Sequence, residues 1–222
     1  MNPSYSRTFV VSWRALAAAI AVVLCCGLPS LSAAAAITFT PEEKAFIEAH
    51  PVITVSDVDW QPLSIVEDDR QQGLFHDYYR LVANRTGLAF RFVPLGGGLD
   101  FQVVLDALRD RRIDMIDGTG KTTERAGYAL FAGPYWQFPL GIASRDDGMA
   151  YSLESLAGKR VAVAHGSTAE EYLREHAPGL DITETTDPFA ALSLVATHKA
   201  DAAVENMAVA AYAIRKAGLT NV

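Results

Sequence analysis

The sequence predicts an α/β fold made of two lobes, and two observations lead to this expectation. Strand-like and helix-like segments alternate along the chain, a pattern that favours a largely parallel sheet in each lobe. The pattern then starts afresh after Pro134, where a second series of strands and helices begins. We therefore expect lobe 1 at residues 37–134, an inter-lobe crossover at residues 135–139 and lobe 2 at residues 140–222.

Lobe 1 is expected to open with a helix at residues 40–50. Thr40, Pro41 and Glu43 form the signature of a capping box with proline at the first helical position. Gly87 is expected to end the next helix, and Asp100 to cap a third. The other predicted elements of lobe 1 are strands at 52–55, 63–66, 89–94 and 113–118 and a helix at 75–86.

Lobe 2 repeats the alternation of strand and helix. Its strands are rich in valine and alanine, and Asp187 with Pro188 marks one helix start. The chain ends at Val222, where a further strand is expected to begin, so we expect that a C-terminal return segment to lobe 1 is missing. The predicted elements are an extended segment at 138–144, strands at 160–164, 181–185 and 201–205, and helices at 168–176, 188–197 and 207–216.

The first 36 residues have the features of a secretory signal peptide. Arg7 and Arg14 are the only charged residues before Glu42, and the apolar run that follows is about 14 residues long. A membrane-spanning helix needs roughly 20 apolar residues, which favours cleavage over an anchor. Small residues at 32–36 offer the cleavage positions. We therefore expect a periplasmic protein, with a tether to the inner membrane in a longer protein as the alternative.

Composition excludes several classes of function. Both cysteines lie in the signal peptide, so the mature chain has no thiol chemistry. The signal peptide holds two of the 19 basic residues, which leaves 17 against 26 acidic residues, a net charge of −9. An acidic chain without basic clusters argues against nucleic acid as a partner. The five histidines show no metal-ligand spacing, and we expect no metal, no cofactor and no catalytic residue.

Arg125 and the pair Ser167 and Thr168 are candidate anion-binding residues. The planar guanidinium of Arg125 suits a carboxylate, although the default role of a lone arginine is a surface salt bridge. Ser167 and Thr168 open a helix directly after a strand, where amides and hydroxyls bind anions, and plain N-capping is the structural alternative. Arg125 is expected to face an open cleft, and its removal is expected to leave stability almost unchanged.

Three further residues are candidates to line a ligand pocket. Trp60 precedes Pro62 on a loop and offers a flat apolar wall, with core packing as the alternative. Thr119 lies at a strand end, the edge at which ligands of open α/β sheets collect. Asp57 also follows a strand and is expected either to accept from a ligand cation or to cap its loop.

Five stretches, taken in order and spacing, resemble the family 3 extracellular solute-binding proteins. They lie at 53–62, 112–125, 131–135, 156–172 and 200–206. The resemblance implies a type II periplasmic-binding-protein-like fold whose two lobes close on a small polar ligand, as in Venus-flytrap receptors for amino acids. It also implies ligand roles for the candidate residues above. Residue 206 is a departure, because the amino-acid receptors place an acidic residue where this chain has Asn206, which puts binding of an ordinary α-amino acid in doubt.

The leader at residues 40–51 is similar to the entry of periplasmic domains in membrane-bound sensors, including hybrid histidine kinases and diguanylate cyclases. This favours a sensory input domain for a small, carboxylate-bearing solute, acting on a signalling output domain. The alternative is the substrate-binding component of an ABC transporter, acting with a permease. An enzymatic role is the third possibility, because the fold also occurs in a secreted dehydratase and a lytic transglycosylase, but we expect a binding domain and not an enzyme.

Overall fold

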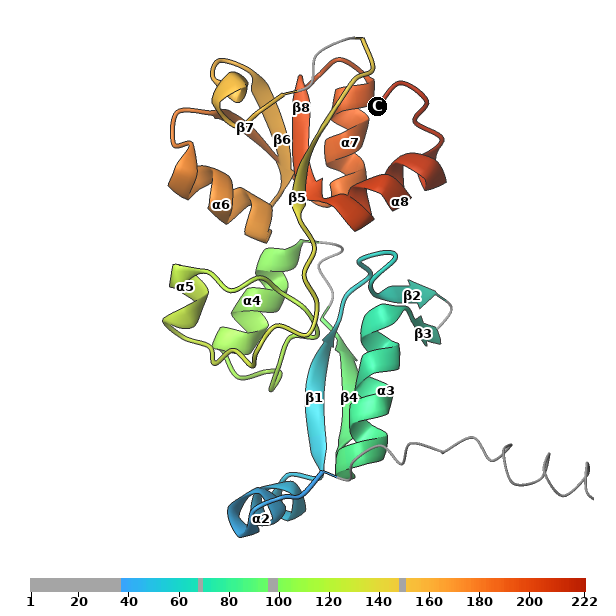
Figure 1. Ribbon diagram of the computed structural model, residues 1–222, viewed down its shortest axis with the longest axis vertical. Coiled ribbons are helices and arrows are strands. Elements are labelled where there is room, and N and C mark those ends of the chain that lie inside the picture. The colour runs from blue at the N-terminus through green and yellow to red at the C-terminus, as the bar shows by residue number, and fades with distance from the viewer. Residues whose placement is uncertain (1–36, 68–69, 96–99, 148–150) are drawn as a thin grey trace, which may run out of the picture. The chain divides into compact units, whose positions relative to one another are not determined.

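The computed structural model describes residues 37–67, 70–95, 100–147 and 151–222 (Figure 1). The predicted signal peptide, residues 1–36, lies outside the described residues. Residues 39–222 form one compact unit, separate from residues 1–38, and all that follows concerns this unit. Its strands form one set of sheets before the predicted crossover and another after it, which confirms the two-lobed α/β expectation.

Lobe 1 opens with α2 (Pro41–Ala49), and the predicted capping box is present. The Thr40 hydroxyl accepts from the Glu43 amide at 3.2 Å, while the Glu43 carboxylate accepts from the Thr40 amide at 2.8 Å. Two amides of the helix start, those of Thr40 and Glu43, are thereby satisfied.

A short parallel sheet follows, with one helix packed against it (Figure 1). Strand β1 (Val52–Asp57) pairs in parallel with β4 (Ala89–Pro94), and α3 (Leu74–Thr86) connects them. Gly87 ends α3 in the left-handed conformation at φ 80°, as predicted. The strand predicted at 63–66 is observed as β2 (Ile65–Glu67), which pairs antiparallel with a strand that was not predicted, β3 (Arg70–Gln72).

Asp100 caps α4 (Phe101–Arg109) as predicted, but the strand expected at 113–118 does not form. Only Met115 bridges Val55 there. The side chain of Asp114 explains the correction, because its carboxylate accepts from both the amide and the hydroxyl of Thr54, at 2.7 and 2.6 Å. The Asp114 side chain thus accepts the hydrogen bond from β1 that the backbone of a neighbouring strand would otherwise accept.

Lobe 2 is built on a four-stranded sheet in the order β5-β8-β6-β7, in which β5 is antiparallel to β8 and the other pairs are parallel. Apart from the short helix η1, which was not predicted, the observed elements follow the predicted ones to within a few residues. They are β5 (Leu140–Ser144), η1 (Glu154–Leu156), β6 (Arg160–Ala164), α6 (Thr168–His176), β7 (Asp181–Thr185), α7 (Pro188–Ala196), β8 (Ala202–Asn206) and α8 (Met207–Ala217).

Both faces of this sheet are covered, because alternate strand residues point to opposite faces. Val161 and Val163 of β6 pack with Leu173 of α6 on one face. Ala162 of β6 belongs to the other face, together with Leu192 of α7 and residues of α8. A central strand with apolar residues on both faces is typical of a buried parallel sheet.

The two lobes touch through α8 of lobe 2 and the segment before β2. Tyr212 and Lys216 both donate to the Gln61 side-chain oxygen, the tyrosine hydroxyl at 3.1 Å. Val209 packs nearby with Leu63 and Phe75 in one apolar cluster. This contact and the one at Arg125 described below join lobe 2 to lobe 1.

Candidate ligand-binding site

A cavity of about 1160 Å³ is lined by loops of lobe 1 and by strand-to-helix turns of lobe 2. Asp57 alone of the seven predicted ligand-binding residues does not line it: its carboxylate accepts from Gln71 at 3.1 Å and lies 3.8 Å from His76. The other six, drawn from four separate stretches of the sequence, do line the cavity: Trp60, Thr119, Arg125, Ser167, Thr168 and Asn206.

Arg125 lies in the short helix α5 (Thr123–Ala126), which Thr122 caps. Its side chain is 1% exposed, and its guanidinium reaches oxygen atoms of both lobes. Lobe 1 contributes the Thr119 hydroxyl and the Gly120 carbonyl, the latter at 3.3 Å. Lobe 2 contributes the Gly166 carbonyl at 2.8 Å, the Thr168 hydroxyl at 3.0 Å and the Glu171 carboxylate at 2.6 and 2.7 Å.

The expectation that Arg125 faces an open cleft is therefore wrong. The reason is Glu171, whose carboxylate pairs with the Nε and Nη2 edge of the guanidinium and draws α6 against α5. A buried arginine requires such pairing, because an uncompensated charge out of water is costly. Removal of Arg125 is consequently expected to affect stability, which reverses the earlier expectation.

Ser167 forms the N-cap that was the structural alternative, and both Ser167 and Thr168 line the cavity. The Ser167 hydroxyl accepts from the Glu170 amide at 3.1 Å and so caps α6. The Thr168 hydroxyl accepts from Arg125 and, at 3.2 Å, from the Gly120 amide. Amides of the first helical turn lack intrahelical acceptors, which suits this turn to an anion.

The lobes approach so closely here that Gly120 has no room for a side chain. A Cβ at Gly120 would lie 2.5 Å from the Thr168 Cγ2 atom. Gly166, at φ 70°, would place a Cβ 2.7 Å from the Gln102 amide nitrogen. Glycine at both positions is required for this backbone approach.

Trp60 and Thr119 belong to the lobe 1 side of the cavity. Trp60 is half-buried, stacks obliquely on Phe75 with ring centroids 6.2 Å apart and joins the same apolar cluster, so both of its proposed roles are compatible. The Thr119 hydroxyl oxygen accepts a hydrogen bond from the Arg125 guanidinium. The position of Thr119 in the cavity is thus fixed by a charged neighbour.

Asn206 ends β8, and its side-chain oxygen caps α8 by accepting from Ala208 at 2.9 Å. Its neighbour Glu205 also lines the cavity, is 4% exposed and accepts from the Asn206 amide at 2.7 Å. Burial raises the pKa of Glu205 to about 7. An acidic residue therefore does adjoin the cavity, one position before the place where the family resemblance led us to look.

Asp117 is a second buried carboxyl beside the cavity. Ser56 donates to one of its oxygens at 3.1 Å, and the other has no partner among the described residues. Burial is the main cause that raises the pKa of Asp117 to about 7, and the nearby Asp57 adds to it. The Asp117 carbonyl accepts from Tyr135 in the crossover segment, which connects this carboxyl to the inter-lobe connection.

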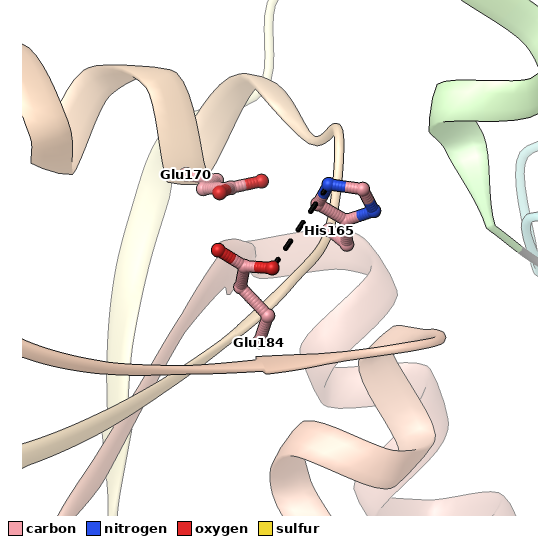
Figure 2. Close-up of side chains that lie close together, drawn as sticks. All are labelled: His165, Glu170 and Glu184. Carbon is pink, nitrogen blue, oxygen red and sulfur yellow. Dashed lines mark ion pairs between the residues drawn. The ribbon is translucent and has the colours of Figure 1, made fainter.

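His165, Glu170 and Glu184 gather after β6, as Figure 2 shows, close enough to suggest a metal site. Arg174 occupies this cluster instead: it pairs with Glu170 at 2.7 Å and with Glu184. His165 lies 3.9 Å from Glu184. A guanidinium that already neutralises both carboxylates removes the charge a metal ion would need, so these residues do not extend the site.

Glu171 and Glu205 were not predicted from the sequence. Glu205 carried a signal, because it is a charged residue directly after three apolar residues of a predicted strand. Glu171 carried none, because a glutamate in the first turns of a helix is ordinary. Its role depends on a partner 46 residues away.

The fold and the cavity define a two-lobed solute-binding domain, and comparison with known proteins agrees. Residues 52–218 match the family described as bacterial extracellular solute-binding proteins, family 3, and the chain belongs to that family. No helix in the described part of the chain has the length and apolar character to cross a membrane.

Relatives include both sensors and receptors. The chain is 26% identical to the virulence sensor protein BvgS of Bordetella pertussis over 182 residues, which cover 80% of this chain and 14% of BvgS. It is 27% identical to the arginine-binding extracellular protein ArtP of Bacillus subtilis, over 57% of this chain and 49% of ArtP. The crystal structure of a histidine kinase sensor domain similar to periplasmic binding proteins matches with a TM-score of 0.71 and 30% identity, covering 78% of this chain and 76% of that one.

Proposed function

We propose that this chain binds a small polar solute in the cavity between its lobes, in the periplasm, as the input domain of a membrane-bound signalling protein. The observation that carries the proposal is that six residues chosen from the sequence line one cavity of about 1160 Å³. A space of this size holds a small organic molecule. Family membership supports solute binding, and similarity to a histidine kinase sensor domain supports the sensory role.

The solute is proposed to carry a carboxylate or a similar anion. Arg125 supplies a bidentate cation, and the first turn of α6 at Thr168 supplies amide donors on the other lobe. Glu205 and the side-chain amide of Asn206 offer a second polar end, toward which an ammonium or hydroxyl group of the solute is directed. A change in the populations of lobe arrangements would report binding, because a ligand shifts such an equilibrium only by its different affinities for the two states.

Binding is tested by a thermal-shift screen of the purified chain with the standard amino acids and with small mono- and dicarboxylic acids. Hits are then titrated calorimetrically into wild type, Thr119→Val and Glu205→Gln. We expect weakened affinity in both variants, and the matched control Glu175→Gln, on an exposed part of α6, is expected to bind like wild type. A hit whose affinity is equal in all four proteins would place its site elsewhere.

The transport role is the second candidate, supported by the similarity to the arginine-binding protein ArtP. Fractionation of cells that express the gene from its own locus separates the two. A sensor stays with the membrane at a mass above the 24.0 kDa of this chain, whereas a free receptor is released by osmotic shock. Recovery in the shock fluid would refute the sensory proposal and leave solute binding intact.

A further inference from the structure

Every nitrogen of the Arg125 guanidinium already contacts an acceptor within the protein. A guanidinium has five N–H donors in a fixed fork. The structure sets five acceptor atoms around it, from the side chains of Thr119, Thr168 and Glu171 and from two glycine carbonyls. An incoming carboxylate therefore meets a guanidinium whose nitrogens are all engaged, and it must displace an acceptor to form its own ion pair.

Among these acceptors, Glu171 is the one that has the same chemistry as an incoming carboxylate. Its side chain is 21% exposed, whereas that of Arg125 is 1% exposed, so the carboxylate regains water when it leaves. Thr168 and Glu171 are three residues apart in α6 and share one face of that helix, which places both against the guanidinium. The other charged residue of this turn, Glu170, faces elsewhere and pairs with Arg174.

We propose that Glu171 is a built-in occupant of the carboxylate site at Arg125, which a carboxylate-bearing solute must replace. The pairing has the chemistry of ligand recognition, a carboxylate on the Nε and Nη2 edge of a guanidinium at 2.7 and 2.6 Å. The carboxylate belongs to lobe 2 and the guanidinium to lobe 1, so their pairing holds the lobes together without solute. Glu171 thereby sets both the affinity threshold for carboxylates and the resting closure of the domain.

This inference deepens the proposed function, but its test needs no physiological solute. In Glu171→Ala the site is emptied, and free acetate or formate supplies the missing carboxylate. We expect either salt to raise the melting temperature of Glu171→Ala in a saturable manner, at concentrations that leave wild type and Glu175→Ala unchanged beyond the effect of sodium chloride. Glu175 is one turn later in α6, is exposed and forms no ion pair with any described residue.

Arg125 must mediate this rescue. The double variant Arg125→Ala/Glu171→Ala is expected to lose it, and Glu171→Gln, which fills the space without charge, to show less of it than Glu171→Ala. Equal responses to acetate in Glu171→Ala and Glu175→Ala would overturn the proposal and leave Glu171 as a structural ion pair. Should Glu171→Ala fail to fold, acetate added during refolding of Glu171→Gln and Glu171→Ala gives the same comparison, since only an emptied carboxylate site recovers.

A carboxylate found in the solute screen provides a separate reading. An internal occupant that fills the site nine-tenths of the time lowers the apparent affinity about tenfold. Glu171→Gln is therefore expected to bind such a carboxylate about tenfold more tightly than wild type. Tighter binding of the solute without rescue by acetate would mean that solute binding holds but that Glu171 is not an internal occupant. Rescue by acetate without any hit in the solute screen would mean that Glu171 is an internal occupant but that the proposed function fails.

Discussion

Replacing Arg125 by alanine is expected to destabilise the domain, because this side chain is buried and joins the two lobes. The change strands the Gly166 and Gly120 carbonyls and leaves the Glu171 carboxylate without its cation. Removal of one partner of a buried ion pair costs about 3–5 kcal/mol. Because Glu171 is 21% exposed and regains water, we take the lower end, about 3 kcal/mol.

The assay is thermal and urea unfolding of wild type, Arg125→Ala and Arg125→Lys. For a domain of this length about 3 kcal/mol corresponds to a fall of about 6–12 °C in melting temperature. Arg125→Lys is expected to lie between the two, since an ammonium keeps the charge but not the planar fork. The control is Arg80→Ala, whose guanidinium is 65% exposed beside Asp77 and is expected to matter by less than about 1 kcal/mol.

A melting temperature of Arg125→Ala within about 2 °C of wild type would refute this reasoning, because the change would then be worth under about 1 kcal/mol. Such a result would mean that the guanidinium contacts form and break freely in solution. Arg125 would then regain the role expected from sequence, an exposed residue waiting for a ligand.

Three further predictions follow from other parts of the molecule. Burial raises the pKa of Glu205 from 4.5 to about 7, so the folded protein retains a proton that the unfolded chain releases. Stability therefore falls by up to about 3 kcal/mol as the pH rises between these two values. Glu205→Gln should flatten this fall in thermal melts from pH 4 to 8. Gly120→Ala should cost about 1–3 kcal/mol in urea unfolding through its clash with Thr168, while Gly133→Ala, with open space, should not. Mass spectrometry of the periplasmic protein should find cleavage within residues 33–37.

Local signals were sufficient to predict most of the elements. The capping box at Thr40 and the glycine stop at Gly87 are short-range features, and both form as expected. The predicted strand at 113–118 failed because its partner, Thr54, is 60 residues away and binds the Asp114 side chain instead. Periodicity alone contains no information about such a competitor.

The candidate site likewise has a part that the sequence predicts and a part that it does not. Ser167 and Thr168 were found from their place at a helix start, and Trp60, Thr119, Arg125 and Asn206 also line the cavity, although the strand predicted before Thr119 does not form. The environment of Arg125 was not found, because its burial depends on Glu171 and Gly166 in another lobe. Asp57 was misplaced for a similar reason, since Gln71 and His76 hold its side chain away from the cavity.

The backbone contact at Gly120 also decides how a solute travels. Where Gly120 meets Thr168 there is no space even for one carbon atom, so that rim of the cavity is shut while the lobes are together. Leu130 and Trp136 line the same cavity and are exposed, the leucine fully and the tryptophan by 47%. A solute that enters the cavity can therefore contact a flat apolar surface as well as exposed charged residues such as Arg111 and Lys121.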